Sequence, residues 1–307
     1  MNKIIVTGAA GFIGSNLVKK LLLDKNNKVY GIDNSDDDTF IKDALQHKNF
    51  LMGWENMQSI QDCSKDFRVD RIYHLAAVAD IKASLTDTTM DFDNNAFGTH
   101  CVLEFMRERK VKEIVFPSSA VVYGATDVRP TPESLPNITP ISQYGASKFA
   151  CEAFINAYSH LYDIKSWIFR FSNVVGDNIH RGVIYDFYHK LQRDNKNLEI
   201  LGNGNQMKTL FHISDCIDAL INIPNSGETG TYNLGNTDYI TVNAIADIVC
   251  EELGFKPKRT YTGGVGGWKG DTPHCILDIS KVLSTGWKPQ YDCEDAVRKT
   301  VQYLNKE

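Results

Sequence analysis

The chain has 307 residues, of which 42% are hydrophobic and 23% charged, so it is long enough to bury a sizeable core. Its formal net charge of −5 argues against a nucleic-acid partner, and no apolar stretch is long enough to span a bilayer. The N-terminus runs straight into a strand pattern and the seven cysteines show no C-x-x-C spacing, so we expect a cytoplasmic protein without disulfides or a metal site.

The first predicted elements are a strand over residues 3–6 and a helix over residues 12–23. The turn between them and the first turn of the helix carry three glycines. Gly8 allows the turn to be tight, Gly11 lets the backbone approach a pyrophosphate, and Gly14 lets the helix pack closely on the strand. Phosphates can then meet the N–H groups and positive dipole of the helix start. The pattern predicts a dinucleotide site, although such a turn can also bind nothing.

A second predicted strand, residues 28–32, ends at Asp33. This aspartate follows the glycines by about twenty residues, the spacing at which a carboxylate accepts both hydroxyls of an adenosine ribose. No Arg or Lys follows in residues 34–38 to hold a 2′-phosphate. The sequence therefore favours NAD over NADP, although an aspartate at a strand end can also be only a turn residue or cap.

Strand-like runs continue in alternation with helical stretches up to residue 170. They cover residues 49–53, 70–74, 111–116 and 165–171. This alternation is typical of the α/β class, and we predict a Rossmann-type doubly wound parallel sheet with helices on both faces. Beyond residue 170 the elements become shorter, which predicts a smaller C-terminal α/β lobe that closes over the substrate.

Tyr144 and Lys148 lie four residues apart in a helix predicted over residues 143–162, so they share one face. A nearby ammonium favours the phenolate of Tyr144, which makes it a usable base near neutral pH. A single pair of this kind is usually only a surface contact. Here Ser119 closes the strand that ends near residue 116, where its hydroxyl can lie between the substrate and Tyr144.

The chain resembles the extended short-chain dehydrogenase/reductase family, and within it the nucleotide-sugar epimerases of the UDP-galactose 4-epimerase type. The resemblance covers nearly the whole chain. The motifs that carry it are Thr7–Gly14, His74–Ala77, Asn94–Asn95 with Gly98–Thr99, Ser118–Gly124, Tyr144–Lys148 with Glu152, and Arg170–Gly176.

The resemblance implies an NAD-binding domain over residues 1–170, to which residues 209–235 return, and a nucleotide-sugar lobe over residues 171–307. It also implies a homodimer with a four-helix interface built from the helices at residues 94–109 and 144–162. The residues expected to bind NAD are Gly8, Gly11, Phe12, Ile13, Gly14, Asp33, Asn34, Leu75, Ala76, Ala77, Asn95, Tyr144, Lys148 and Val174.

The reaction that the resemblance implies is inversion at C4 of a UDP-hexose. Tyr144, aided by Ser119, removes the C4 hydroxyl proton while the C4 hydride passes to NAD⁺, and the keto sugar turns over and takes the hydride back on its other face. The similar 4,6-dehydratases and decarboxylases carry an acidic residue directly after the hydroxyl residue, whereas this chain has Ala120 and Val121. Without that acid, elimination lacks its proton donor.

The residues expected by resemblance to bind the substrate, besides Ser119 and Tyr144, are Asn173 and Lys208 at the diphosphate, Asp271 at a ribose hydroxyl and Cys275 beside C2 of the sugar. Lys208 and Trp268 stand where the family has arginines, and lysine lacks the bidentate fork of arginine. Because Cys275 is small, we expect UDP-GlcNAc and UDP-GalNAc to fit as well as UDP-glucose and UDP-galactose.

Three alternatives remain open at this point. The first is an epimerase for another nucleotide sugar, a uronate or a heptose. The second is a net NAD-dependent nucleotide-sugar dehydrogenase or reductase that releases its reduced cofactor. The third is a non-catalytic protein that kept the dinucleotide fold, against which the presence of Ser119, Tyr144 and Lys148 argues.

Overall fold

The computed structural model describes residues 2–63, 67–79, 86–267 and 274–306. Internal contacts divide the chain into two units. Unit 1 comprises Met1–Gly124, Asn137–Arg170 and Leu220–Tyr232, and unit 2 comprises Ala125–Pro136, Phe171–Ala219 and Asn233–Glu307. Across the described residues, no helix has both the length and the apolar character needed to cross a bilayer.

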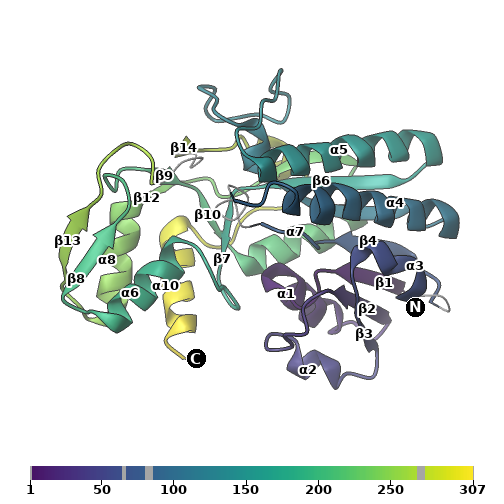
Figure 1. Cartoon of the computed structure of the whole chain (residues 1–307), viewed down its shortest axis with the longest axis horizontal. Coiled ribbons are helices and arrows are strands. Elements are labelled where there is room, and N and C mark those ends of the chain that lie inside the picture. Colours follow the sequence, from purple (N-terminus) through teal and green to yellow (C-terminus); the bar gives the residue numbers. More distant parts are fainter. Residues whose placement is uncertain (1, 64–66, 80–85, 268–273, 307) are drawn as a thin grey trace. The chain divides into compact units, whose positions relative to one another are not determined.

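A seven-stranded sheet lies at the centre of unit 1, with the order β11-β6-β5-β4-β1-β2-β3 (Figure 1). Neighbouring strands from β3 to β5 pair in parallel. The strands are β1 (Asn2–Thr7), β2 (Asn27–Asp33), β3 (Phe50–Trp54), β4 (Arg71–His74), β5 (Glu113–Ser119), β6 (Lys165–Phe171) and β11 (Gly230–Leu234). The predicted doubly wound parallel sheet is thereby confirmed.

The strand order reverses between β1 and β4. The chain runs outward from β1 through β2 to β3, and then crosses back to β4 on the other side of β1. In open parallel sheets, ligands bind at the carboxyl ends of the strands at such a reversal. The glycine turn follows β1 at this edge of the sheet.

Helices of unit 1 are α1 (Phe12–Leu21), α2 (Lys42–Leu45), α3 (Ile60–Cys63), α4 (Gly98–Arg109) and α5 (Gln143–Tyr162), whereas α7 (Ile213–Ser226) belongs partly to each unit. Short helical segments among the described residues are η1 (Met57–Ser59), the π-helix η3 (Phe92–Phe97) and η4 (Ala120–Tyr123). The long helix α5 has the bounds that the sequence predicts. The Ser142 hydroxyl caps it by accepting a hydrogen bond from the Gly145 N–H at 3.0 Å.

Alternation along the strands divides the core of unit 1 between the two faces of the sheet. Ile5, Ile72 and Ile114 pack in one buried cluster with residues of α4 and α5, including Leu103 and Ile155. The neighbouring residues on each strand point to the opposite face. Helices α4 and α5 lie side by side in Figure 1, and together they cover one face of the sheet.

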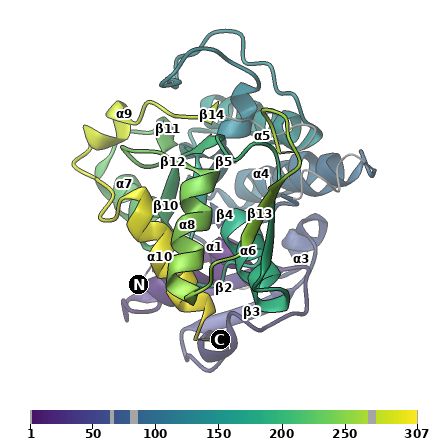
Figure 2. The same ribbon diagram turned by 90° about the vertical axis from the view of Figure 1, so that its left-hand side faces the viewer.

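Unit 2 contains three small sheets and a group of helices. Its sheets pair β7 (Asn173–Val175) with β10 (Leu210–His212), β8 (Asn197–Ile200) with β13 (Lys258–Tyr261), and β9 (Met207–Lys208) with both β12 (Ile240–Thr241) and β14 (His274–Cys275). Its helices are α6 (Val183–Arg193), α8 (Val242–Leu253), α9 (Ser280–Leu283) and α10 (Cys293–Leu304). Figure 2 shows α8 and α10 packed side by side. These short elements match the smaller α/β lobe expected after residue 170.

Candidate active site

The glycine turn after β1 is shaped by two close approaches of the backbone. Gly8 has a φ of +67°, and a Cβ there would lie 2.8 Å from the Ala76 nitrogen. A Cβ on Gly14 would lie 1.9 Å from the Gly8 carbonyl oxygen, so α1 can approach the turn only because residue 14 is glycine.

Gly11 differs from these two glycines because the protein itself leaves room beside it. A Cβ there would meet only the Gly8 oxygen, at 3.4 Å. Gly11 also stands at the start of α1, where no side chain caps the helix. Uncapped N–H groups and open space beside a helix start suit an anionic group such as a pyrophosphate. The turn therefore fits a dinucleotide.

Asp33 ends β2 beside this turn. Its carboxylate accepts hydrogen bonds from the Ala10 N–H at 2.9 Å and from the Ser35 N–H at 3.1 Å. Each of these bonds uses one oxygen, and each oxygen keeps a second acceptor position for a hydroxyl group. The residues of the turn thus match a ribose as well as a pyrophosphate.

A chain of buried hydrogen bonds connects the turn to α5 through His74. The imidazole contacts the hydroxyl of Thr7 through Nδ1 at 2.8 Å and the hydroxyl of Thr99 through Nε2 at 3.0 Å. Thr99 donates to the Cys151 sulfur at 3.2 Å, and the thiol donates to the carbonyl of Asn95 at 3.3 Å. Burial, and then the charge of Lys148, lower the pKa of His74 to about 3, so the ring is neutral at physiological pH.

The direction of the hydrogen bonds in this buried series fixes the tautomer of His74. Thr99 donates its one hydroxyl proton to the Cys151 sulfur, so towards Nε2 of His74 it can only accept, and the ring proton lies on Nε2. Nδ1 therefore accepts from the Thr7 hydroxyl, whose oxygen also accepts from the Ala76 N–H at 3.0 Å. The resemblance had named His74 and Thr99 without a role. Their place in motifs of the family is the only signal that the sequence gives for them.

Asn95 holds the segment that follows β4. Its amide oxygen accepts from the Val78 N–H at 2.8 Å, and its amide nitrogen donates to the Val78 carbonyl at 3.0 Å and to the Ser147 hydroxyl at 2.9 Å. The same nitrogen lies 3.2 Å from a carboxylate oxygen of Asp91. Asn95 lies in the π-helix, and it connects the segment after β4 with α5.

Ser119, Tyr144 and Lys148 all come from the end of β5 and the start of α5. Ser119 is the last residue of β5, and its side chain accepts a hydrogen bond from the Val121 N–H at 3.4 Å. Tyr144 and Lys148 lie on successive turns of α5, with Tyr144 half-buried. A Cβ on Gly145 would lie 2.9 Å from the Val121 carbonyl oxygen, so this glycine lets α5 approach the turn after Ser119 closely.

The ammonium of Lys148 is buried, with 3% of the residue exposed. It donates to the Pro117 carbonyl at 2.9 Å and lies 4.5 Å from the centre of the Phe116 ring. Burial lowers the pKa of Lys148 to about 8, while Cys151 and Glu152 on the next turn oppose the fall. The side chain therefore still carries its charge at neutral pH.

Residues expected to bind the substrate lie around Thr209 in unit 2. Lys208 and Cys275 are register partners in β9 and β14, and the Thr209 hydroxyl donates to the Cys275 carbonyl at 3.1 Å. The Asn173 amide donates to the Thr209 carbonyl at 3.1 Å. Val174, expected at NAD, pairs with Phe211 in the sheet of β7 and β10. Asp271 and Trp268 lie outside the described residues.

In the described part of the chain, no three His, Cys, Asp or Glu side chains gather as a metal ion would require.

Comparison with known proteins assigns this chain and its fold to a family. The model of the NAD dependent epimerase/dehydratase family matches residues 4–235. The chain is 33% identical to the putative UDP-glucose 4-epimerase of Methanocaldococcus jannaschii, over 98% of each chain. It is 29% identical to the UDP-glucuronate 4-epimerase of Thermodesulfobacterium geofontis, over 99% of this chain and 96% of that one. A crystal structure of UDP-galactose 4-epimerase matches with a TM-score of 0.87 and 34% identity, over 99% of each chain.

The chain belongs to the NAD-dependent epimerase/dehydratase family. It is an NAD-dependent enzyme of the nucleotide-sugar epimerase type, so the predicted family, cofactor and isomerase class are confirmed. The relatives are named for different sugars, so their names do not choose the substrate.

The depressed pKa of Lys148 predicts a pH-dependent gain in stability. Between pH 8 and the ordinary lysine pKa near 10.4, the unfolded chain binds a proton at residue 148 that the folded chain has lost, so folding becomes more favourable as pH rises. The free energy of unfolding of the wild type, relative to Lys148→Met, should change little below pH 7. It should then increase by up to about 1.4 kcal/mol per pH unit between pH 8 and 10.

Urea unfolding of both proteins without NAD at pH 6, 7, 8, 9 and 10 measures this difference. Lys19→Met, at an exposed position on α1, controls for the loss of a lysine as such. If the difference in free energy of unfolding between the wild type and Lys148→Met stays constant from pH 6 to 10, this result contradicts the buried, charged state of Lys148.

Proposed function

We propose that the chain is a UDP-hexose 4-epimerase that interconverts UDP-glucose and UDP-galactose. The observation that carries this proposal is the buried Lys148 ammonium on the helix of Tyr144, held at the end of the strand that carries Ser119. A positive charge fixed beside a phenol favours the phenolate, which is the form that can accept a proton from a sugar hydroxyl.

The residues that follow Ser119 support epimerisation over elimination. Ala120 and Val121 form the first half of η4, directly after the proposed catalytic hydroxyl. Neither can protonate a leaving hydroxyl group. Oxidation at C4 and return of the hydride need no such acid, because the only proton moved is that of the C4 hydroxyl.

The roles of the proposed catalytic residues are distinct. Tyr144 removes the proton from the C4 hydroxyl and later returns it, Ser119 orients the same oxygen, and Lys148 stabilises the phenolate. NAD, when bound, supplies the acceptor that takes a hydride from C4 and gives it back. The residues proposed to hold it are Gly8, Gly11, Phe12, Ile13, Gly14, Asp33, Asn34, Leu75, Ala76, Ala77, Asn95, Tyr144, Lys148 and Val174.

Unit 2 is proposed to bind the nucleotide sugar through Asn173, Lys208 and Cys275, together with Asp271. The hydrogen bonds around Thr209 support the first three as one group. Lys208 supplies positive charge to the diphosphate. The small side chain of Cys275 leaves space beside C2, so we extend the proposed substrates to UDP-GlcNAc and UDP-GalNAc.

A substrate panel tests this proposal. The protein, with NAD added, is incubated separately with UDP-glucose, UDP-GlcNAc and UDP-glucuronate, and inversion at C4 is followed by proton NMR. We expect inversion of the first two sugars and at least about tenfold slower inversion of the uronate, a difference of about 1.4 kcal/mol in transition-state stabilisation. Absorbance at 340 nm should show no lasting rise, because NAD is regenerated in each turnover.

Each alternative has its own signature in the same panel. Turnover of UDP-glucose together with no turnover of UDP-GlcNAc contradicts the role given to Cys275. Turnover of the uronate alone, or of a nucleotide heptose added as a fourth substrate, replaces the proposed hexose. A lasting rise at 340 nm indicates a net dehydrogenase, and NAD binding without any turnover indicates a binding protein.

We further propose a homodimer that uses the face formed by α4 and α5. Large apolar side chains are exposed along this face of unit 1, namely Phe92, Phe97, Phe154, Leu161 and Tyr162. Rings of Phe97, His100, Phe154 and Tyr158 continue the row across both helices, with centroids 6.2–6.4 Å apart. A row of exposed aromatic side chains on two adjacent helices is suited to pack against its own copy about a two-fold axis.

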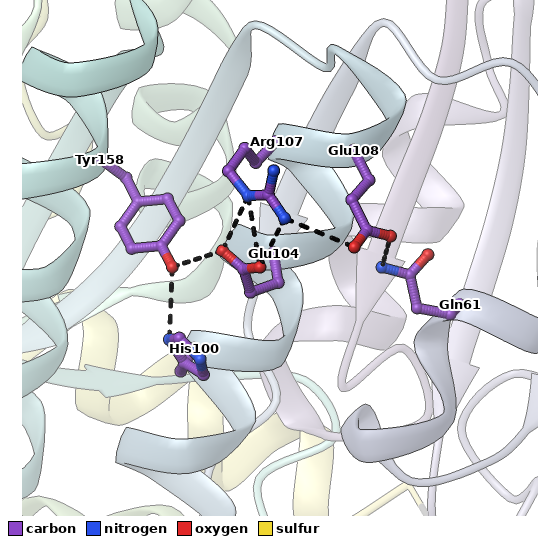
Figure 3. Close-up of polar contacts among 6 residues, drawn as sticks. All are labelled: Gln61, His100, Glu104, Arg107, Glu108 and Tyr158. Carbon is purple, nitrogen blue, oxygen red and sulfur yellow. Dashed lines mark hydrogen bonds and ion pairs between the residues drawn. The ribbon is translucent and has the colours of Figure 1, made fainter.

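Several polar side chains of α4 and α5 have partners within the chain (Figure 3). The Tyr158 hydroxyl donates to Glu104 at 2.6 Å, and Arg107 pairs with the same carboxylate at 2.8 Å. The hydrogen bonds from Arg107 and then Tyr158 lower the pKa of Glu104 to about 2. Gln61 donates to Glu108 at 2.9 Å at the end of the row. These side chains can therefore approach a second copy without needing new partners.

The substitution Phe154→Arg tests the dimer, because it places a charge in the middle of the aromatic row. Sedimentation velocity should show a dimer for the wild type and a monomer for Phe154→Arg. Leu23→Arg is the matched control, since Leu23 is also exposed but follows α1, which does not belong to this face. A monomeric wild type, or a Phe154→Arg variant that stays dimeric, would show that this face is not the interface.

A cytoplasmic location is also proposed. Six cysteines have free thiols, the state that a reducing compartment maintains: Cys101, Cys151, Cys216, Cys250, Cys275 and Cys293.

A further inference from the structure

A buried ion pair lies one helical turn beyond Lys148. Glu152 and Arg170 are 2% and 5% exposed, and the guanidinium donates to both carboxylate oxygens at 2.7–3.2 Å. Arg170 also lies 4.8 Å from the centre of the Tyr123 ring, at the end of η4. The proposed proton transfer uses neither charged residue, so their burial needs another explanation.

The ion pair holds the end of β5. The carboxylate of Glu152 accepts a hydrogen bond from the hydroxyl of Ser118, which directly precedes Ser119. Lys148, one turn earlier on α5, donates to the carbonyl of Pro117. Two successive residues of the strand are therefore each held by a buried side chain of the same helix.

The start of α5 also packs closely on η4, on the other side of Ser119. The approach to the Val121 carbonyl is possible because residue 145 has no Cβ. The first three turns of α5 thus contact Pro117, Ser118 and Val121, and Ser119 lies within the segment that they hold. Tyr144 stands on the first of these turns.

We propose that Ser118, Glu152 and Arg170 form a positioning unit that sets the register between the end of β5 and α5, and so the placement of Ser119 relative to Tyr144. Arg170 fixes the carboxylate through two oxygens, and the carboxylate fixes the strand through Ser118. None of the three touches the reacting atoms. The role in catalysis rests on the proposed function, whereas the role in holding the strand does not.

Ser118→Ala tests the unit without leaving a buried charge unpaired, because the ion pair remains intact. Ser166→Ala is the matched control. Ser166 lies on β6, is buried to a similar extent, and accepts a hydrogen bond from Ser159 of α5 at 3.0 Å. Both variants lose one buried hydroxyl that joins a strand to α5, but only Ser118 adjoins Ser119.

Hydrogen–deuterium exchange measured by mass spectrometry is the first readout. In Ser118→Ala, peptides that cover residues 117–123 and 143–148 should exchange at least threefold faster than in the wild type. In Ser166→Ala they should not change. Equal exchange in the wild type and Ser118→Ala would overturn the proposal, whatever the activity.

Turnover of UDP-glucose is the second readout. Ser118→Ala should lower kcat by at least tenfold with KM changed less than twofold and NAD still bound, Ser166→Ala should keep wild-type kcat, and Ser118→Thr should recover most of the loss. A normal kcat in Ser118→Ala, or an equal loss in Ser166→Ala, overturns the positioning role. If the wild type inverts no nucleotide sugar, the proposed function fails, and the exchange readout alone decides whether Ser118 holds the strand.

Discussion

The site depends on a lysine ammonium that the fold removes from water. Burying a charge is costly unless nearby groups compensate for it, and Lys148 has the Pro117 carbonyl, the Phe116 ring and the Glu152 carboxylate close by. Arg170 neutralises Glu152, so the buried group of three charges keeps one net positive charge. That charge belongs to a residue one turn beyond Tyr144 on the same helix, the spacing at which a lysine can favour the phenolate of a tyrosine.

The dinucleotide turn and α5 belong to one polar network within unit 1. Thr7 at the end of β1 reaches Cys151 of α5 through His74 and Thr99, and Asn95 joins the segment after β4 to Ser147. His74 can stay buried in this chain because it is neutral and both ring nitrogens have partners. A buried polar network of this kind favours one arrangement of the elements that it joins.

Local patterns in the sequence predicted much of the fold and the main candidate residues. The helix Gln143–Tyr162 has a capping serine, and its bounds agree with the prediction. The apolar run before Ser119 ends at Phe116. The strand β5 nevertheless continues through Pro117 and Ser118 to Ser119. The apolar pattern therefore ends before the strand does.

These local patterns do not show which side chains far apart in the sequence become hydrogen-bond or ion-pair partners in the fold. The sequence shows Glu152, Arg170 and Ser118 as motif residues, but only the fold shows that they share one buried cluster. The π-helix Phe92–Phe97 has no comparable local signal. Likewise, residues 125–136 follow the Ser119 segment directly but belong to unit 2, where Thr131 forms a bridge with Leu277.

The central claim, that the Tyr144 phenol transfers the proton at C4, is tested most directly by Tyr144→Phe, which removes one oxygen atom. The account predicts that this variant keeps NAD bound but inverts UDP-glucose at least about 100-fold more slowly than the wild type, the usual contribution of a positioned acid–base group. Inversion at the wild-type rate would contradict the account.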